Sequence, residues 1–352
     1  MQGHLVRRLF TFAFLVASTG VVAEPARVDA SLDRYAAPAR RVDIGAGRRL
    51  NLRCSGQGAP TVMLDIGLGE SSFAWRKVQP PLAKTTRVCS YDRAGFGFSD
   101  AGPLPRTARA EADDLHALVH AAGIRTPVVL VGHSLGSYIA RLYANLHPAD
   151  VAAIVVVDLP NGDFDEFEPE VARLFARMNR DDIEGGPYRR CLQAARDGLL
   201  AQPTADNAAC FAHASPRPEF SARLTASMRA GAAKPAFWEA LLSEKSAWSD
   251  ATPTALKATR RAYGAMPLVI LAADGSNAYL PPELRRQADA AWAASYRRLA
   301  ETSTRSTIIT VEHSSHLMYE DRPDAIVAAV ADLVGQIRAR SHPASQAERR
   351  SH

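Results

Sequence analysis

The sequence predicts an α/β fold: an eight-stranded, mostly parallel sheet with helices on both faces. Short apolar runs rich in Val, Ile and Leu alternate with segments whose apolar residues recur near helical spacing. This alternation is typical of parallel strands that are buried between helices. The chain has 352 residues, of which 22% are charged and 47% hydrophobic. That composition is ordinary for a globular protein, and the length suits one large α/β domain with an insertion.

The apolar runs give the expected strands in chain order. They lie at residues 41–44, 50–54, 62–66, 88–91, 128–131, 154–158, 268–272 and 307–311. Only Gly45-Ala46-Gly47 and two arginines separate the first two runs, which predicts an antiparallel hairpin. Helices are expected at 108–122 and 135–145, and a C-terminal helix with an apolar stripe at 320–330.

Residues 159–265 interrupt this rhythm because they contain no clear strand run. Helical patterns occur around 170–178, 188–200 and 237–242. We therefore predict a helical lid that is inserted after the sixth strand and covers any site formed by the sheet. The sheet domain then comprises residues 24–158 and 266–337.

Both ends of the chain differ from its body. Arg7 and Arg8 precede an apolar stretch that closes with Val21-Val22-Ala23, a pattern that predicts a signal peptide over residues 1–23. An uncleaved anchor or a buried N-terminal helix is the alternative. Residues 338–352 are polar and predict a flexible tail. We expect an exported protein, periplasmic or extracellular, with no stable membrane anchor after processing.

The charge balance argues against nucleic acid as a partner. The formal charge is +5. Six arginines and one acid lie in the two ends, so the body between them carries equal numbers of acidic and basic residues. A surface that tracks phosphates needs clustered Lys and Arg on the fold itself.

Four cysteines, an even set in a chain expected to be exported, predict disulfides. None lies in a Cys-x-x-Cys pair, so neither a redox motif nor a zinc site is indicated. Of the three possible connectivities we favour Cys54–Cys89 and Cys191–Cys210, because each pair stays within one region of the chain. Free buried thiols are the alternative.

The strongest chemical signal is Gly132-His133-Ser134-Leu135-Gly136. It follows the apolar run at 128–131 and precedes a helical segment, which is the strand, sharp turn and helix that a Gly-x-Ser-x-Gly nucleophile requires. A Cβ at either glycine would crowd the neighbouring strand and helix. We therefore predict Ser134 as a nucleophile. A glycine-serine turn that only packs helix against sheet is the alternative.

Together with three other segments, this motif resembles the α/β-hydrolase superfamily, and specifically a secreted bacterial esterase- or lipase-like branch with a helical lid. The other segments are 65–72, 91–100 and 313–316. The resemblance runs from about residue 41 to 333 and is weakest in the expected lid. It implies an oxyanion hole formed by the backbone N–H groups of Leu68 and Leu135. We interpret the Gly95-x-Gly97 turn, with Asp92 and Arg93, as structural.

The resemblance also implies a histidine base and an acid. His316 follows the last expected strand and occupies the family's histidine position, with His313 as the competing choice. For the acid, Asp158 ends the sixth strand and Asp274 follows the seventh. We favour Asp158 and keep Asp274 as the alternative. The test is a hydrogen bond to the imidazole Nδ1.

These residues predict a serine hydrolase that cleaves a carboxylic ester, or a related acyl bond, of a small molecule through an acyl-enzyme. A serine at this turn disfavours the family branches that use an aspartate nucleophile. The alternatives are a cofactor-free haloperoxidase or perhydrolase, and a catalytically silent binding protein on the same scaffold. No sequence feature demands a metal ion or an organic cofactor, so none is expected.

Overall fold

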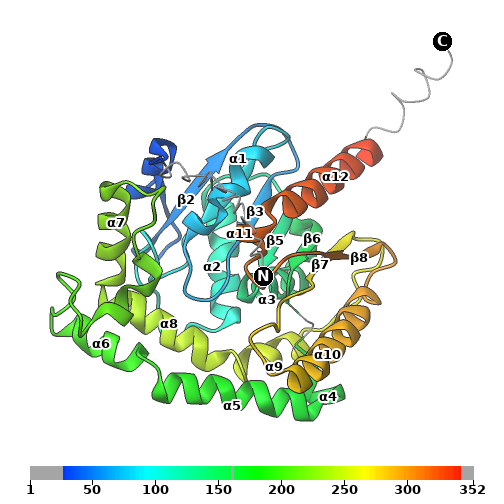
Figure 1. Ribbon diagram of the computed structural model, residues 1–352. Helices are drawn as coiled ribbons and strands as arrows, with labels where there is room; N and C mark the ends of the chain where they lie inside the picture. The colour runs from blue at the N-terminus through cyan, green and yellow to red at the C-terminus, as the bar shows by residue number, and fades with distance from the viewer. Residues whose placement is uncertain (1–26, 160–161, 342–352) are drawn as a thin grey trace, which may run out of the picture.

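The computed structural model describes residues 27–159 and 162–341 (Figure 1). The expected signal peptide and most of the expected tail lie outside these residues. Eight strands form one sheet in the order β1-β2-β4-β3-β5-β6-β7-β8. They are β1 (Arg40–Asp43), β2 (Arg49–Ser55), β3 (Val62–Asp65), β4 (Val88–Tyr91), β5 (Val128–His133), β6 (Val151–Val157), β7 (Leu268–Ala273) and β8 (Ser306–Val311).

The sheet is mostly parallel, as the sequence predicts. β1 and β2 form the expected antiparallel hairpin, and β2 is also antiparallel to β4. All other neighbouring strands are parallel. Each of the eight apolar runs overlaps one observed strand, so the predicted fold class is confirmed.

Helices cover both faces of the sheet. Successive residues of a strand point to opposite faces, so each strand packs against both helix layers. Val128 and Leu130 of β5 pack with α2 (Ala108–Ala121), α3 (Leu135–Leu146) and α10 (Pro282–Ala300). Val129 and Val131 face the other side. There they pack with η2 (Ser72–Lys77), α1 (Gln79–Leu82), α11 (Met318–Asp321) and α12 (Pro323–Ser341). Two further 3-10 helices, η1 (Ala30–Ala36) and η3 (Pro148–Asp150), complete this part of the chain.

The expected C-terminal helix differs from the prediction in two ways. It is broken at Arg322 into α11 and α12, because Pro323 disfavours the helical conformation of the residue before it. It also continues to Ser341, so the first four residues of the expected tail are helical. Arg338 donates to the carbonyl oxygens of Ala59 and Thr85, which holds this last part of α12 against the body.

Between β6 and β7 the described chain consists of helices joined by loops, with no strand of the sheet. These inserted helices are α4 (Phe164–Phe167), α5 (Pro169–Gly185), α6 (Tyr188–Arg196), η4 (Ala208–Ala214), α7 (Ala222–Ala232), α8 (Pro235–Ala247) and α9 (Ala251–Ala258). In Figure 1 they form an arc along one side of the molecule, from α7 through α6 and α5 to α4. They have a small core of their own around Trp238, Phe237 and Phe211.

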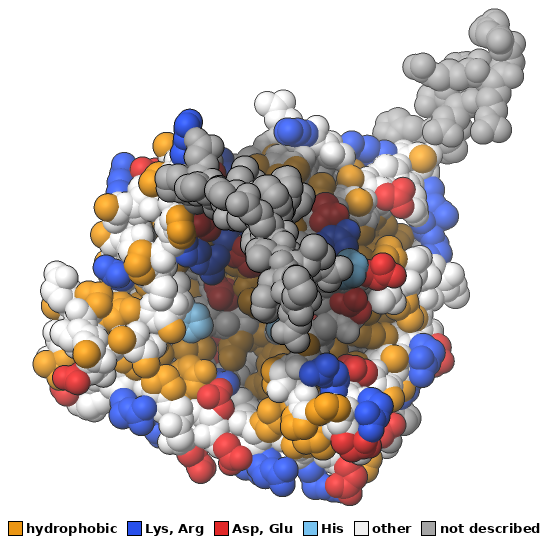
Figure 2. Space-filling view, in the orientation of Figure 1, with side chains coloured by type: hydrophobic (Ala, Val, Ile, Leu, Met, Phe, Trp, Pro, Cys, Tyr) orange, Lys and Arg blue, Asp and Glu red, His pale blue; other side chains and the backbone are white. Residues whose placement is uncertain are grey.

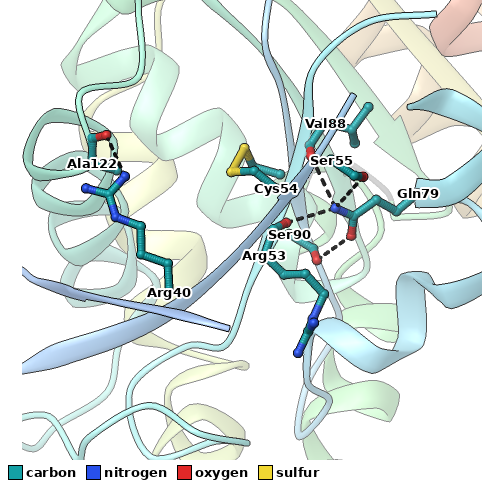
Figure 3. The surroundings of a disulfide bond; sticks show 9 residues. Arg40, Arg53, Cys54, Ser55, Gln79, Val88, Ser90 and Ala122 are labelled. Carbon is teal, nitrogen blue, oxygen red and sulfur yellow. Dashed lines mark hydrogen bonds between the residues drawn. A yellow bond between two sulfur atoms is a disulfide. The ribbon is translucent and has the colours of Figure 1, made fainter. Parts of the chain in front are cut away.

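Two disulfides are present, with the predicted pairing. Cys54 and Cys89 lie directly opposite each other on β2 and β4. Figure 3 shows Gln79 beside this bond; its amide donates to the carbonyl of Val88 and accepts from the Ser90 hydroxyl. Cys191 and Cys210 join α6 to η4 within the inserted helices. Disulfides are typical of proteins that fold in an oxidising, exported environment. Within residues 27–159 and 162–341, no helix combines the length and apolar character needed to cross a membrane.

Candidate active site

Ser134 sits at the sharp turn between β5 and α3. Its φ is 52° and its ψ is −126°, a backbone conformation that residues other than glycine seldom adopt. The flanking glycines allow the turn because other backbone lies close to them. A Cβ on Gly132 would come within 2.3 Å of the Gly136 carbonyl oxygen, and a Cβ on Gly136 within 2.3 Å of the Asp65 carbonyl oxygen. The crowding inferred from the motif is therefore present in the fold.

His316 lies in the loop after β8, and its Nδ1 is 2.8 Å from Oδ2 of Asp158. Asp158 follows the last residue of β6 and is fully buried. Its Oδ1 accepts hydrogen bonds from the Tyr296 hydroxyl at 3.1 Å and the Ala273 N–H at 3.0 Å. The Ser276 hydroxyl donates to Oδ2. These donors stabilise a carboxylate and hold it in one orientation against the imidazole.

The alternative acid, Asp274, makes different contacts. Its two oxygens accept the backbone N–H groups of His313 and Ser314, each at 3.0 Å. These hydrogen bonds lower the pKa of Asp274. Asp274 thus holds the turn that follows β8, while Asp158 contacts the ring of His316. His313 lies in that turn with a φ of 57°.

His133, the residue before Ser134, supports His316 in a way that the motif did not reveal. Its Nε2 lies 2.7 Å from the carbonyl oxygen of His316, so this nitrogen carries the proton. The centroids of the two imidazole rings are 4.8 Å apart. Burial, and then the nearby His316, lower the pKa of His133 well below its usual value. His133 therefore stays neutral and does not oppose a positive charge on His316.

Two adjoining cavities meet at His316. The smaller one, about 280 Å³, is lined by Gly67, Leu68, His133, Ser134 and Tyr319, among others. The larger one, about 670 Å³, runs among α5, α9 and α10. Both are also bordered by Asn179, Lys245 and Trp248 of the inserted helices. The space-filling view shows a hollow on this side of the molecule, bordered by the inserted helices (Figure 2).

Leu68 and Leu135, the expected oxyanion-hole residues, both adjoin Ser134. Leu68 lines the smaller cavity with the serine, and Leu135 begins α3 directly after it. The glycine before Leu68 is close enough that a Cβ on it would lie 3.1 Å from the Ser134 Cβ. The segment 67–69 thus passes beside the serine at the amino end of α3, where developing negative charge is favoured.

A buried arginine fixes the segment that carries Leu68. Arg93 donates to the carbonyl oxygens of Ile66 and Gly67 and contacts Asp65 at 3.0 Å. Its guanidinium also makes two hydrogen bonds to Glu244 on α8, at 2.7 and 3.1 Å. Burial opposes the charge of Arg93, but Glu244 and Asp65 outweigh it and raise its pKa well above the usual value. Arg93 thus makes contacts well beyond its own turn, since its partner Glu244 lies 151 residues away in the chain.

The Arg93–Glu244 pair gives a stability prediction. Both side chains are 1% exposed, so Glu244→Ala leaves a buried guanidinium partly uncompensated. We expect the free energy of unfolding to fall by about 3–5 kcal/mol, measured by urea denaturation. Glu239 lies on the same helix as Glu244, and Glu239→Ala removes its exposed ion pair with Arg196 of α6. For this variant we expect the free energy of unfolding to fall by less than about 1 kcal/mol. Equal losses in the two variants would contradict this account.

Together, the parallel sheet, the serine at its strand–helix turn and the histidine–aspartate pair define an α/β hydrolase. Residues 67–329 match the model of the alpha/beta hydrolase family, so the chain belongs to this family. It resembles the 2-hydroxymuconate semialdehyde hydrolase of Pseudomonas sp. (strain CF600), with 38% identity over 121 residues, 32% of this chain and 41% of the relative. The "Probable transporter efuK" of Hormonema carpetanum is 38% identical over 125 residues, 33% of this chain and 18% of that protein.

The matched stretch spans less than half the length of these curated relatives. Among solved structures, an ancestral haloalkane dehalogenase superimposes with a TM-score of 0.61 at 20% identity. That match covers 86% of this chain and all of the dehalogenase chain. At this level of identity the match shows the shared fold alone. The comparisons therefore establish the family and the fold of this chain.

Proposed function

We propose that this protein is an exported serine hydrolase that cleaves carboxylic esters of small molecules. The observation that carries the proposal is the geometry around His316. Its Nδ1 faces the buried carboxylate of Asp158, and its ring borders the same cavity as Ser134 at the strained turn. Because Asp158 occupies Nδ1, Nε2 is the ring nitrogen that can accept a proton from the serine.

In the proposed reaction the Ser134 oxygen attacks the ester carbonyl carbon, and its proton passes to Nε2 of His316. The oxyanion forms beside the N–H groups of Leu68 and Leu135. Collapse of this intermediate breaks the bond to the alcohol, which leaves with the proton from His316. Water then attacks the acyl-serine with the same proton transfers, which releases the acid and restores Ser134.

The larger cavity favours uncharged, largely apolar substrates. Its volume of about 670 Å³ is within the range typical of small-molecule sites. Leu159, Phe175, Met178, Trp248 and Trp292 contribute apolar surface. The two lysines on its border are paired, Lys245 with Asp182 and Lys257 with Asp165. With both lysines paired, the apolar part of the cavity suits an aliphatic or aromatic acyl group, and we propose that the inserted helices act as its lid.

Hydrolysis of p-nitrophenyl esters from acetyl to palmitoyl tests the proposal. We expect turnover with a clear optimum of chain length, and covalent labelling of Ser134 by a phosphonate probe, located by peptide mass. Turnover that depends on peroxide in acetate would instead favour the perhydrolase alternative. Absence of both turnover and labelling would favour a silent binding protein.

Filling the larger cavity should change which ester is preferred. Ala176 of α5 lines this cavity, whereas its neighbour Arg177 is exposed. We expect Ala176→Phe to lower kcat/KM for the longest accepted acyl chains by about tenfold or more, while acetyl ester hydrolysis stays within about twofold. Arg177→Phe adds a ring of the same size outside the cavity. If it shifts the chain-length profile as much as Ala176→Phe, this cavity is not the acyl site.

A further inference from the structure

A cluster of histidines lies away from the candidate active site. His116 and His120 are one turn apart near the end of α2, so their side chains share a face of the helix. Asp150, the last residue of η3, faces them. One ligand atom from each of the three residues lies within 4.8 Å of the other two. Oδ2 of Asp150 is 2.9 Å from Nε2 of His120 and 3.5 Å from Nε2 of His116.

The two separations from Asp150 are close to those found around a tetrahedral metal ion. Zinc binds histidine nitrogen and carboxylate oxygen at about 2.0–2.2 Å, which puts neighbouring ligand atoms about 3.3–3.5 Å apart in a tetrahedron. The separation between Oδ2 of Asp150 and Nε2 of His116 already has this length. The separation between Oδ2 and Nε2 of His120 needs to increase by only a few tenths of an ångström. Two imidazoles and one carboxylate are also a ligand set that divalent zinc prefers.

We propose that His116, His120 and Asp150 form a binding site for a divalent transition metal of the zinc class, with the fourth position taken by water. The ligands are open enough for an ion to enter, because the side chains of His116 and His120 are 35% and 49% exposed. The Asp150 side chain is 18% exposed and therefore better fixed.

The groups around the cluster orient its members. Thr126 and the Tyr143 hydroxyl, the latter at 3.4 Å, contact the carboxylate of Asp150. The ring of His147 stacks on that of His116, with centroids 3.8 Å apart and planes at 15°. Fixed outer contacts of this kind are what hold metal ligands in position.

The position of this site indicates a structural role. Asp150 directly precedes β6, whose opposite end leads to Asp158. The cluster therefore lies at the amino end of the strand, away from the cavity of Ser134. An ion there would tie the last turn of α2 to the connection between α3 and β6. It would stabilise the sheet domain without entering the ester reaction.

Zinc titration of the untagged, chelator-treated protein tests the site. We expect one equivalent of Zn²⁺ to bind by isothermal titration calorimetry at micromolar or lower concentration, and saturation to raise the Tm by several degrees. His120→Ala and Asp150→Asn should each weaken binding at least tenfold and remove the Tm shift. His213→Ala replaces an exposed histidine elsewhere and should leave both unchanged.

Two results would overturn the proposal. One is that the wild-type protein binds no zinc at 100 µM. The other is that zinc binds the His120→Ala variant as tightly as the wild type, which would place the ion elsewhere. His120 is half exposed on the helix surface, so loss of binding in its alanine variant, with unchanged circular dichroism, does not reflect failure to fold.

Discussion

Ser134→Ala is expected to lower kcat for p-nitrophenyl ester hydrolysis by about 10⁴-fold or more. The serine oxygen forms the covalent bond in the proposed reaction, and alanine leaves only the oxyanion contacts and substrate binding to assist water. Stability should change little, because the substitution removes one oxygen from a site bordering a cavity. The measurement is initial rates on the best ester of the chain-length series, together with urea denaturation.

Ser246→Ala is the matched control, since it removes an exposed serine hydroxyl from α8. It should retain the wild-type rate. If Ser134→Ala hydrolyses the ester as fast as this control, Ser134 is not the nucleophile, and the proposed acyl-enzyme route is wrong. Loss of rate together with loss of phosphonate labelling would instead agree with the covalent role.

The fold was predictable because the signals that determine it are local. Strands buried on both faces have to be apolar along their whole length, so β5 and β6 stand out in the sequence as runs of Val, Ile and Leu. The glycines around Ser134 were equally informative, because no larger residue fits their crowded positions. Where the prediction was wrong, at Arg322 and after Arg338, the outcome depended on a proline effect and on contacts with distant carbonyls.

The contacts of the site were harder to predict because they join distant parts of the chain. Nothing near Arg93 points to Glu244, and the tautomer of His133 follows from a carbonyl 183 residues away. The spacing of His116 and His120 is visible in the sequence, but two histidines one helical turn apart do not by themselves indicate a metal site. Only folding brings Asp150 beside them.

The choice between two aspartates gives the second large effect. Asp158→Asn is expected to lower kcat about 10⁴-fold with little change in KM. The present carboxylate can only accept from His316 Nδ1, so it fixes the proton on that nitrogen. An amide NH₂ in its place can donate to Nδ1 and favours the opposite tautomer. Nε2 would then be protonated and unable to take the proton of Ser134.

Asp274→Asn is the matched variant, since it makes the same chemical change in the other candidate. Asp274 accepts hydrogen bonds from two backbone N–H groups of the turn after β8 and stabilises that turn. The side-chain oxygen of the new asparagine can still accept one of these two N–H groups. We therefore expect a loss of kcat below about tenfold and a modest decrease in stability. If the two effects were reversed, Asp274 would be the acid, and the contact between Asp158 and His316 would be structural. Because both variants exchange a carboxylate for an amide of the same size, the difference between them reports which residue the imidazole depends on.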